Sequence, residues 1–201
     1  RDELSKYFIV PYIWSDLKNR LVEKESFYNV CEEYGLDYPK TYIYNKGDAT
    51  RDFGFNYPVI VKASDSISFF QNPFEGMNKA YVANNQEEFD KIIKDCYSHG
   101  YEKSMIIQDL IPGEDDHMRV LTCYSDQNGK VKMMCLGHVL LEEHTPKGIG
   151  NHAAIITEYE EELMEKYKEF LEKIGYVGFS NFDIKYDDRD GKFKVFEINL
   201  R

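Results

Sequence analysis

Apolar residues recur along this chain with two different periods, which predict a mixture of helices and strands. A helix repeats its inward face every three to four residues, whereas a strand alternates its faces at every residue. The helical period is present over residues 24–34, 86–99 and 158–174. Short apolar runs predict strands over residues 41–44, 58–63, 80–83 and 104–110. No period is found over residues 64–79 and 142–157, which we expect to be long loops.

The second half of the chain predicts two hairpins. Residues 117–124 and 131–141 form the first, and residues 181–201 form the second around a tight turn at Asp187–Gly191. Because hairpins outnumber helical crossovers, the expected fold class is α+β with mainly antiparallel sheets.

The last hairpin carries polar side chains on one predicted face. Strand alternation places together Asn181, Asp183 and Lys185 on the first strand, and Val195, Glu197, Asn199 and Arg201 on the second. A turn centred near Asp190 sets Asp183 opposite Glu197, and Asn181 opposite Asn199. Opposed like charges are destabilising, and a divalent cation would remove that penalty. Two carboxylates and an amide oxygen are ligands of the kind that magnesium takes. The alternative interpretation is a solvated face whose charges extend into water.

Composition narrows the class of protein. The chain has 201 residues, a formal net charge of −11 and 15% aromatic residues, so we expect a folded core. It contains no basic cluster, which argues against a nucleic-acid partner, and no apolar run long enough to span a membrane. The four cysteines form no C-x-x-C pair, which suggests free thiols in a reducing cytoplasm.

Two lysines and one acidic segment are further candidates for binding chemistry. Lys62 ends an apolar strand, where it could reach a phosphate or simply extend into water. Lys24 begins a helix, a position at which the helix dipole disfavours a cation unless an anion lies nearby. Residues 106–116 run from an apolar strand through a Pro-Gly bend into an acidic cluster. Such a crossing could hold a flat ring and sugar hydroxyls, or it could be an ordinary connection.

The order of these motifs resembles the ATP-grasp superfamily. A helix-start lysine, a strand-end lysine before a loop, an I-P-G bend and a D…E-x-N-x-R hairpin follow one another over about residues 20–201. The resemblance implies two α+β lobes that hold ATP between them. It also implies a first lobe over residues 24–110 with a lid loop at 64–79, and a second lobe over 111–201 that carries the metal site. Residues 1–23 would be the tail of a preceding domain, and the sequence would be truncated at both ends.

The resemblance implies a role for each matching residue. Lys24 and Lys62 would contact the α- and β-phosphates of ATP, with Ser64 and Ser66 in the phosphate loop. The remaining roles would be an adenine hinge at Gln108, Asp109, Leu110 and Ile111; a ribose contact at Asp115 or Asp116; and Mg²⁺ or Mn²⁺ ligands at Asp183, Glu197 and Asn199. Arg201, Lys147, Asn151 and His152 would lie near the transferring phosphoryl group and the second substrate. The chain departs from the family pattern where Ser64–Ser68 replaces a glycine-rich lid and where Gln108 replaces a common Glu.

Within the superfamily, the stretches IIQDLIPGEDD and FDIKYDDRDGKFKVFEINLR look most similar to carboxylate–amine ligases of Gram-positive bacteria. That branch includes D-aspartate ligases of peptidoglycan cross-bridge synthesis. The resemblance implies a cytoplasmic enzyme that joins a small carboxylate to an amine through an acyl phosphate, with a homodimer as one oligomeric state. The alternatives are an enzyme similar to carbamoyl-phosphate synthase and an ATP-binding module without catalysis.

Overall fold

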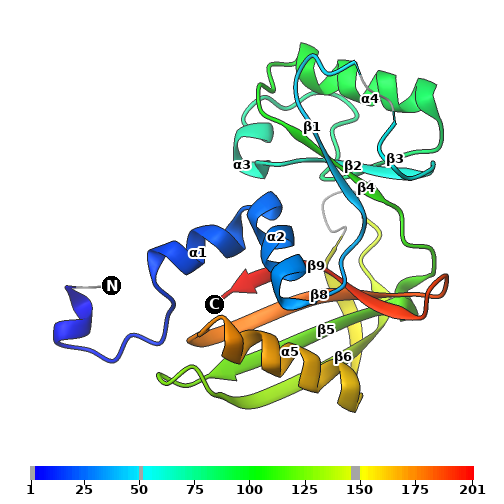
Figure 1. Cartoon of the computed structure of the whole chain (residues 1–201). Coiled ribbons are helices and arrows are strands. Elements are labelled where there is room, and N and C mark those ends of the chain that lie inside the picture. The colour runs from blue at the N-terminus through cyan, green and yellow to red at the C-terminus, as the bar shows by residue number, and fades with distance from the viewer. Residues whose placement is uncertain (1–2, 50–51, 146–149) are drawn as a thin grey trace. The chain divides into compact units, whose positions relative to one another are not determined.

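The computed structural model describes residues 3–49, 52–145 and 150–201, whose contacts divide into two units. The smaller unit comprises residues 39–111 and 143–151, and the larger unit comprises residues 1–38, 112–142 and 152–201. Each unit combines an antiparallel sheet with helices, as Figure 1 shows, so the predicted α+β class is confirmed. No helix in the described part of the chain is long and apolar enough to cross a membrane.

The smaller unit contains a four-stranded antiparallel sheet in the order β1-β4-β2-β3. Its strands are β1 (Thr41–Tyr44), β2 (Val59–Ala63), β3 (Tyr81–Ala83) and β4 (Met105–Asp109). Its helices are α3 (Ser66–Phe69) and α4 (Gln86–Ser98). The Asn85 side chain caps α4 by accepting a hydrogen bond from the Glu88 N–H at 3.0 Å.

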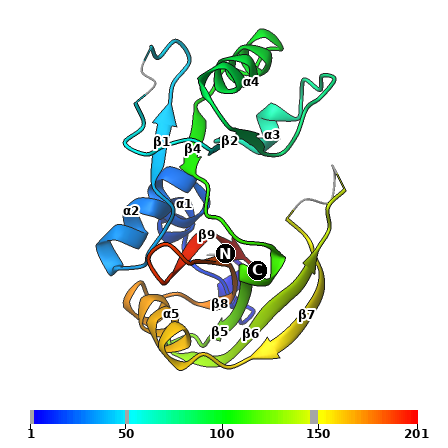
Figure 2. The ribbon, with the colours of Figure 1, turned by 90° about the vertical axis from the view of Figure 1, so that its right-hand side faces the viewer.

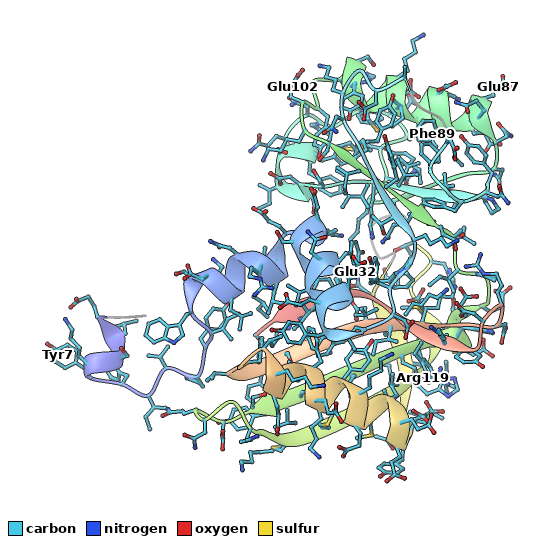
Figure 3. The ribbon with its side chains drawn as sticks, viewed as in Figure 1. Tyr7, Glu32, Glu87, Phe89, Glu102 and Arg119 are labelled. Carbon is cyan, nitrogen blue, oxygen red and sulfur yellow. The ribbon has the colours of Figure 1, made fainter. Side chains whose placement is uncertain are left out.

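The core of the smaller unit lies between α4 and one face of its sheet. Phe89, labelled in Figure 3, is fully buried there, and Ile93 and Cys96 of the same helix are buried beside it. In β2, Val59 and Val61 are fully buried in this core, whereas Lys62 is only partly buried. Strand alternation therefore places Lys62 on the face of the sheet away from α4.

The larger unit contains a five-stranded antiparallel sheet in the order β7-β6-β5-β8-β9. Its strands are β5 (Met118–Ser125), β6 (Val131–Glu142), β7 (His152–Glu158), β8 (Gly178–Asp187) and β9 (Lys192–Leu200). Its α-helices are α1 (Ser15–Val22), α2 (Lys24–Tyr34) and α5 (Glu161–Lys173), and it has two short 3₁₀ turns, η1 (Leu4–Lys6) and η2 (Asp115–His117).

Helices pack on one face of the larger sheet, and α5 crosses that face in Figure 1. Tyr167 and Phe170 of α5 contact the Phe182 ring of β8, with ring centroids 4.9 and 6.1 Å away. Phe27 of α2 is buried in the same core. Because successive strand residues point to opposite faces, burial of Phe182 and Ile184 turns the side chain between them away from the helices. The polar face of the final hairpin is produced in this way.

Three stretches differ from the prediction. Residues 142–157 contain all of β7 except its last residue, and residues 153–157 are all exposed. An edge strand with two open faces has no burial pattern for the sequence to reveal. Residues 64–79 contain α3, whose N-cap Asp65 accepts a hydrogen bond from Ser68 N–H. Residues 1–23 contain α1, and its Leu21 is 2% exposed in the core of the larger unit.

The division into units also differs from the predicted lobes over 24–110 and 111–201. Helix α2 belongs with the C-terminal strands because Phe27, Val30 and Cys31 lie in their core. Residues 143–151 group with the smaller unit. Sequence order does not reveal either assignment, since the placement of α2 and that of residues 143–151 both depend on contacts between distant segments.

Candidate active site

The register of the β8–β9 hairpin is the one that the sequence predicts. Asp183 lies opposite Glu197, and Asn181 lies opposite Asn199. The register shifts by one residue beyond Asp183, so that Ile184 pairs with Val195. This bulge turns Val195 into the core, where it is fully buried, and corrects the expectation that it shares a face with Glu197.

The three predicted metal ligands gather on this hairpin. The Asn199 amide donates through Nδ2 to Asp183 Oδ2 at 3.2 Å, which sets the orientation of both groups. Glu197 lies directly across from Asp183 and is paired with Lys24, whose Nζ is 3.3 Å from Glu197 Oε2. The carboxylate therefore supplies the anion that a lysine at the start of α2 requires.

A pocket of about 280 Å³ lies beside these residues. It is lined by Tyr12, Leu21, Val22, Lys24, Phe27, Glu197, Ile198, Asn199 and Leu200. Its walls are largely apolar, with Lys24, Glu197 and Asn199 as the polar groups, which is a common composition for a small-molecule site. All of its residues belong to the larger unit.

His152 is partly buried beside the predicted metal ligands. Its Nε2 is 3.7 Å from Asp183 Oδ1, and its Nδ1 is 3.3 Å from Glu142 Oε1. Asp183 and then Glu142 raise the pKa of His152 to about 9, against the lowering effect of burial. No sequence signal marks Glu142, because it falls at the end of a strand with no motif around it.

The other residues predicted for this region are placed differently. The Asn151 carbonyl accepts a hydrogen bond from Glu143 N–H at 2.9 Å within the smaller unit. Arg201 follows β9 and is exposed, with its backbone N–H donated to the Phe179 carbonyl at 3.1 Å. Lys147 lies outside the described residues.

The predicted hinge occupies the end of β4. Gln108 is 2% exposed, and its side-chain Nε2 donates a hydrogen bond to Thr41 Oγ1 at 2.9 Å. This hydrogen bond links β4 to the neighbouring strand β1. The Asp109 N–H donates to the Lys40 carbonyl at 2.9 Å. Ile111 is buried and Leu110 is partly buried.

The two carboxylates predicted for ribose both have protein partners. Asp115 accepts a hydrogen bond from Glu142 N–H at 2.8 Å, and Asp116 contacts the His117 ring at 2.8 Å. Nearby, Lys185 donates to the Gly113 carbonyl at 2.7 Å, and burial lowers the pKa of this lysine. These contacts hold the segment that follows the hinge against the larger sheet.

The predicted phosphate loop belongs to the smaller unit. The Ser64 hydroxyl lies 3.1 Å from Ser104 Oγ and 3.3 Å from Tyr101 Oη, so it forms part of an internal network. Ser66 is the first residue of α3. The structure thus brings Lys24, His152 and the three hairpin ligands together in one unit, and it places Lys62, Ser64, Ser66 and the hinge in the other.

Across residues 3–49, 52–145 and 150–201, no three His, Cys, Asp or Glu side chains form a metal-binding group. The hairpin offers two carboxylates and one amide instead. These are oxygen ligands on a polar sheet face, a donor set that fits a hard divalent cation supplemented by water or phosphate oxygens.

The two α+β units, the polar hairpin and the lysine at the start of α2 define an ATP-grasp domain. Residues 24–201 match the family model described as carbamoyl-phosphate synthase L chain, ATP binding domain, and the chain belongs to this family.

A curated relative is the D-aspartate ligase of Enterococcus faecium (strain Aus0004), which is 50% identical over 206 residues. The match covers 100% of this chain and 49% of the relative, so the chain spans about half of that protein's length.

Solved structures share the fold at low sequence identity. The biotin carboxylase domain of the Hydrogenobacter thermophilus 2-oxoglutarate carboxylase, in complex with MgADP, ADP and bicarbonate, has a TM-score of 0.70 and 17% identity, covering 92% of this chain and 41% of that one. The L-amino acid ligase of Bacillus licheniformis has a TM-score of 0.63 and 15% identity, covering 91% of this chain and 41% of that one. These likenesses confirm the predicted ATP-grasp fold.

Proposed function

We propose that the protein containing this chain is an ATP-dependent carboxylate–amine ligase with D-aspartate as its carboxylate substrate. The observation that carries the proposal is the cluster of Asp183, Glu197 and Asn199 beside Lys24 in a chain that is 50% identical to a D-aspartate ligase. A role in peptidoglycan cross-bridge synthesis, expected from the family resemblance, is part of the proposal. The use of ATP suits an enzyme of the cytoplasm.

The reaction would take place in two steps. A carboxylate oxygen of the acid attacks the γ-phosphorus of ATP and ADP leaves, which gives an acyl phosphate. The amine then attacks the acyl carbon, loses a proton and releases phosphate, which leaves an amide. Both steps depend on positioning and on neutralising negative charge.

The chain's residues would divide this work. Asp183, Glu197 and Asn199 would hold Mg²⁺ or Mn²⁺, which supplies charge neutralisation at the phosphate oxygens. Lys24 and Lys62 would bind the α- and β-phosphates, and Arg201 would bind the transferring phosphoryl group. Further proposed contacts are Ser64 and Ser66 with phosphate; Gln108, Asp109, Leu110 and Ile111 with adenine; Asp115 or Asp116 with ribose; and Lys147, Asn151 and His152 near the reacting groups.

The decisive experiment follows phosphate release by the full-length protein. The protein is incubated with ATP, Mg²⁺, D-aspartate and candidate amines, and amide formation is measured by mass spectrometry. Glu197→Gln removes one negative oxygen from the cluster and should lower phosphate release at least about hundredfold. The matched control is Glu169→Gln, which changes an exposed glutamate of α5 paired with Lys173 and should leave turnover unchanged.

Native turnover in Glu197→Gln would refute the metal role of this residue. Tight ATP binding without phosphate release for any acid–amine pair would favour the non-catalytic module. ADP formation that depends on bicarbonate and needs no amino acid would favour an activity similar to that of carbamoyl-phosphate synthase. The description of the matching family names that enzyme. A homodimer is also part of the proposal, and size-exclusion chromatography with light scattering would test it.

A further inference from the structure

His152 begins β7 directly opposite Glu142, the last residue of β6. The register of this pair shifts twice between Val139 and Glu142. Such irregularities bend strands and change the direction of their side chains. Figure 2 shows β6 and β7 as long curved strands. The bend explains how a side chain of β7 reaches β8, although β6 and β5 separate the two strands in the sheet.

His152 and Asn199 contact different oxygens of the Asp183 carboxylate. The imidazole Nε2 lies 3.7 Å from Asp183 Oδ1, while Asn199 donates to Asp183 Oδ2 at 3.2 Å. The carboxylate is therefore approached at both oxygens, by one residue from β7 and one from β9. A carboxylate that is contacted at both oxygens loses most of its freedom to rotate.

Glu142 holds the imidazole from its other side. Its Oε1 lies 3.3 Å from His152 Nδ1, and its backbone N–H donates to Asp115 Oδ2 at 2.8 Å. The side chains of His152, Glu142 and Asp183 are 11%, 21% and 20% exposed, so little water competes for these contacts. Neither ring nitrogen has a hydrogen-bond partner among the described residues, so the imidazole is held between Glu142 and Asp183 by these two ion pairs.

We propose that His152 is a positioning residue that sets the orientation of Asp183 for a divalent cation, and that Glu142 in turn orients His152. The inference rests on the proposed function, in which Asp183 binds the cation that accompanies ATP. Both ring nitrogens of His152 face carboxylates, so the residue acts through Asp183. Residues that orient metal ligands typically change metal affinity 10- to 100-fold when they are removed.

The test measures Mn²⁺ binding to the full-length protein by electron paramagnetic resonance of the free ion, with and without ADP. His152→Ala should raise the Mn²⁺ dissociation constant about 10- to 100-fold, and Glu142→Ala should raise it about tenfold. His152→Gln places an amide donor near the position of Nε2 and should recover most of the affinity. The control is Glu158→Gln. Glu158 is also a carboxylate of β7, but it belongs to a separate ion-pair group, in which its Oε1 lies 3.6 Å from His138 Nδ1. The Mn²⁺ affinity of this variant should equal that of the native protein.

The sign of the change separates positioning from simple charge balance. If His152 served only as a counter-cation, its removal would tighten Mn²⁺ binding, and that result would overturn the inference. Native affinity in His152→Ala would overturn it as well. Should His152→Ala fail to fold, weakened binding in Glu142→Ala supports the inference and native binding there overturns it. A wild-type protein that binds no Mn²⁺ in the presence of ADP would overturn the proposed function together with this inference.

Discussion

Asp187 at the end of β8 is expected to stabilise the hairpin that carries the candidate site. Its side chain is fully buried, and both oxygens accept hydrogen bonds from cations. Oδ1 accepts from Arg189 Nε at 2.8 Å, whereas Oδ2 accepts from Arg189 Nη2 at 2.7 Å and from Lys194 Nζ at 2.6 Å. Asp187→Asn keeps the shape but replaces one of these oxygens with an NH₂ group that faces two donors.

The size of the effect follows from these contacts. The substitution removes two hydrogen bonds between a carboxylate and a cation, each worth about 1.5–3 kcal/mol. Because the Arg189 side chain is 45% exposed, its share is reduced by solvent screening. We therefore expect a loss of about 2–4 kcal/mol in the free energy of unfolding, a large part of a typical domain's stability.

The pH dependence provides an independent check. Hydrogen bonds from Arg189, followed by those from Lys194, hold the pKa of Asp187 well below its ordinary value of 3.8, against the raising effect of burial. A carboxyl whose folded-state pKa is lowered contributes its full stability above the unfolded-state pKa, and it loses this contribution as the pH falls toward the folded-state pKa. The difference between the wild type and Asp187→Asn should therefore be largest at pH 7 and smaller at pH 3.

Urea unfolding followed by circular dichroism at pH 7 and pH 3 measures this difference. Glu169→Gln serves as a surface control, since an exposed pair with Lys173 contributes at most about 1 kcal/mol. Equal midpoints for wild type and Asp187→Asn at pH 7, or a difference that does not change with pH, would refute the reasoning.

Two further predictions concern other groups of the larger unit. The buried Tyr167 hydroxyl has no hydrogen-bond partner among the described residues. Tyr167→Phe should therefore leave the free energy of unfolding unchanged or raise it by about 1–2 kcal/mol, as measured by thermal unfolding. A marked loss of stability would show that the hydroxyl has a partner. Hydrogen bonds to Asp188 and then to Asp116 raise the pKa of His117 above 6.5, so the contribution of this ion pair is complete below that pH and is lost as the pH rises through the folded-state pKa. Asp188→Asn should move the pKa of His117 downward in an NMR titration, and an unchanged pKa would contradict this assignment.

Local patterns were sufficient for most of the fold. The period of residues 24–34 predicts α2, and the alternation in the last hairpin predicts that Asp183 faces Glu197. Local patterns gave no prediction, or a wrong one, where a strand lacks a buried face or the strand register shifts. The edge strand β7 has no buried face and therefore no pattern, and the bulge opposite Asp183 reverses the face of Val195.

The sequence by itself determined the α+β class, the order of the motifs and the pairing of the final hairpin, because each depends on residues that are close along the chain. Only the tertiary structure decided that Lys24 meets Glu197 and that His152 lies between Glu142 and Asp183. These contacts join segments far apart in sequence, through helix packing in one case and strand curvature in the other. Periodicity records which face of an element is buried, but it does not record which distant element covers that face.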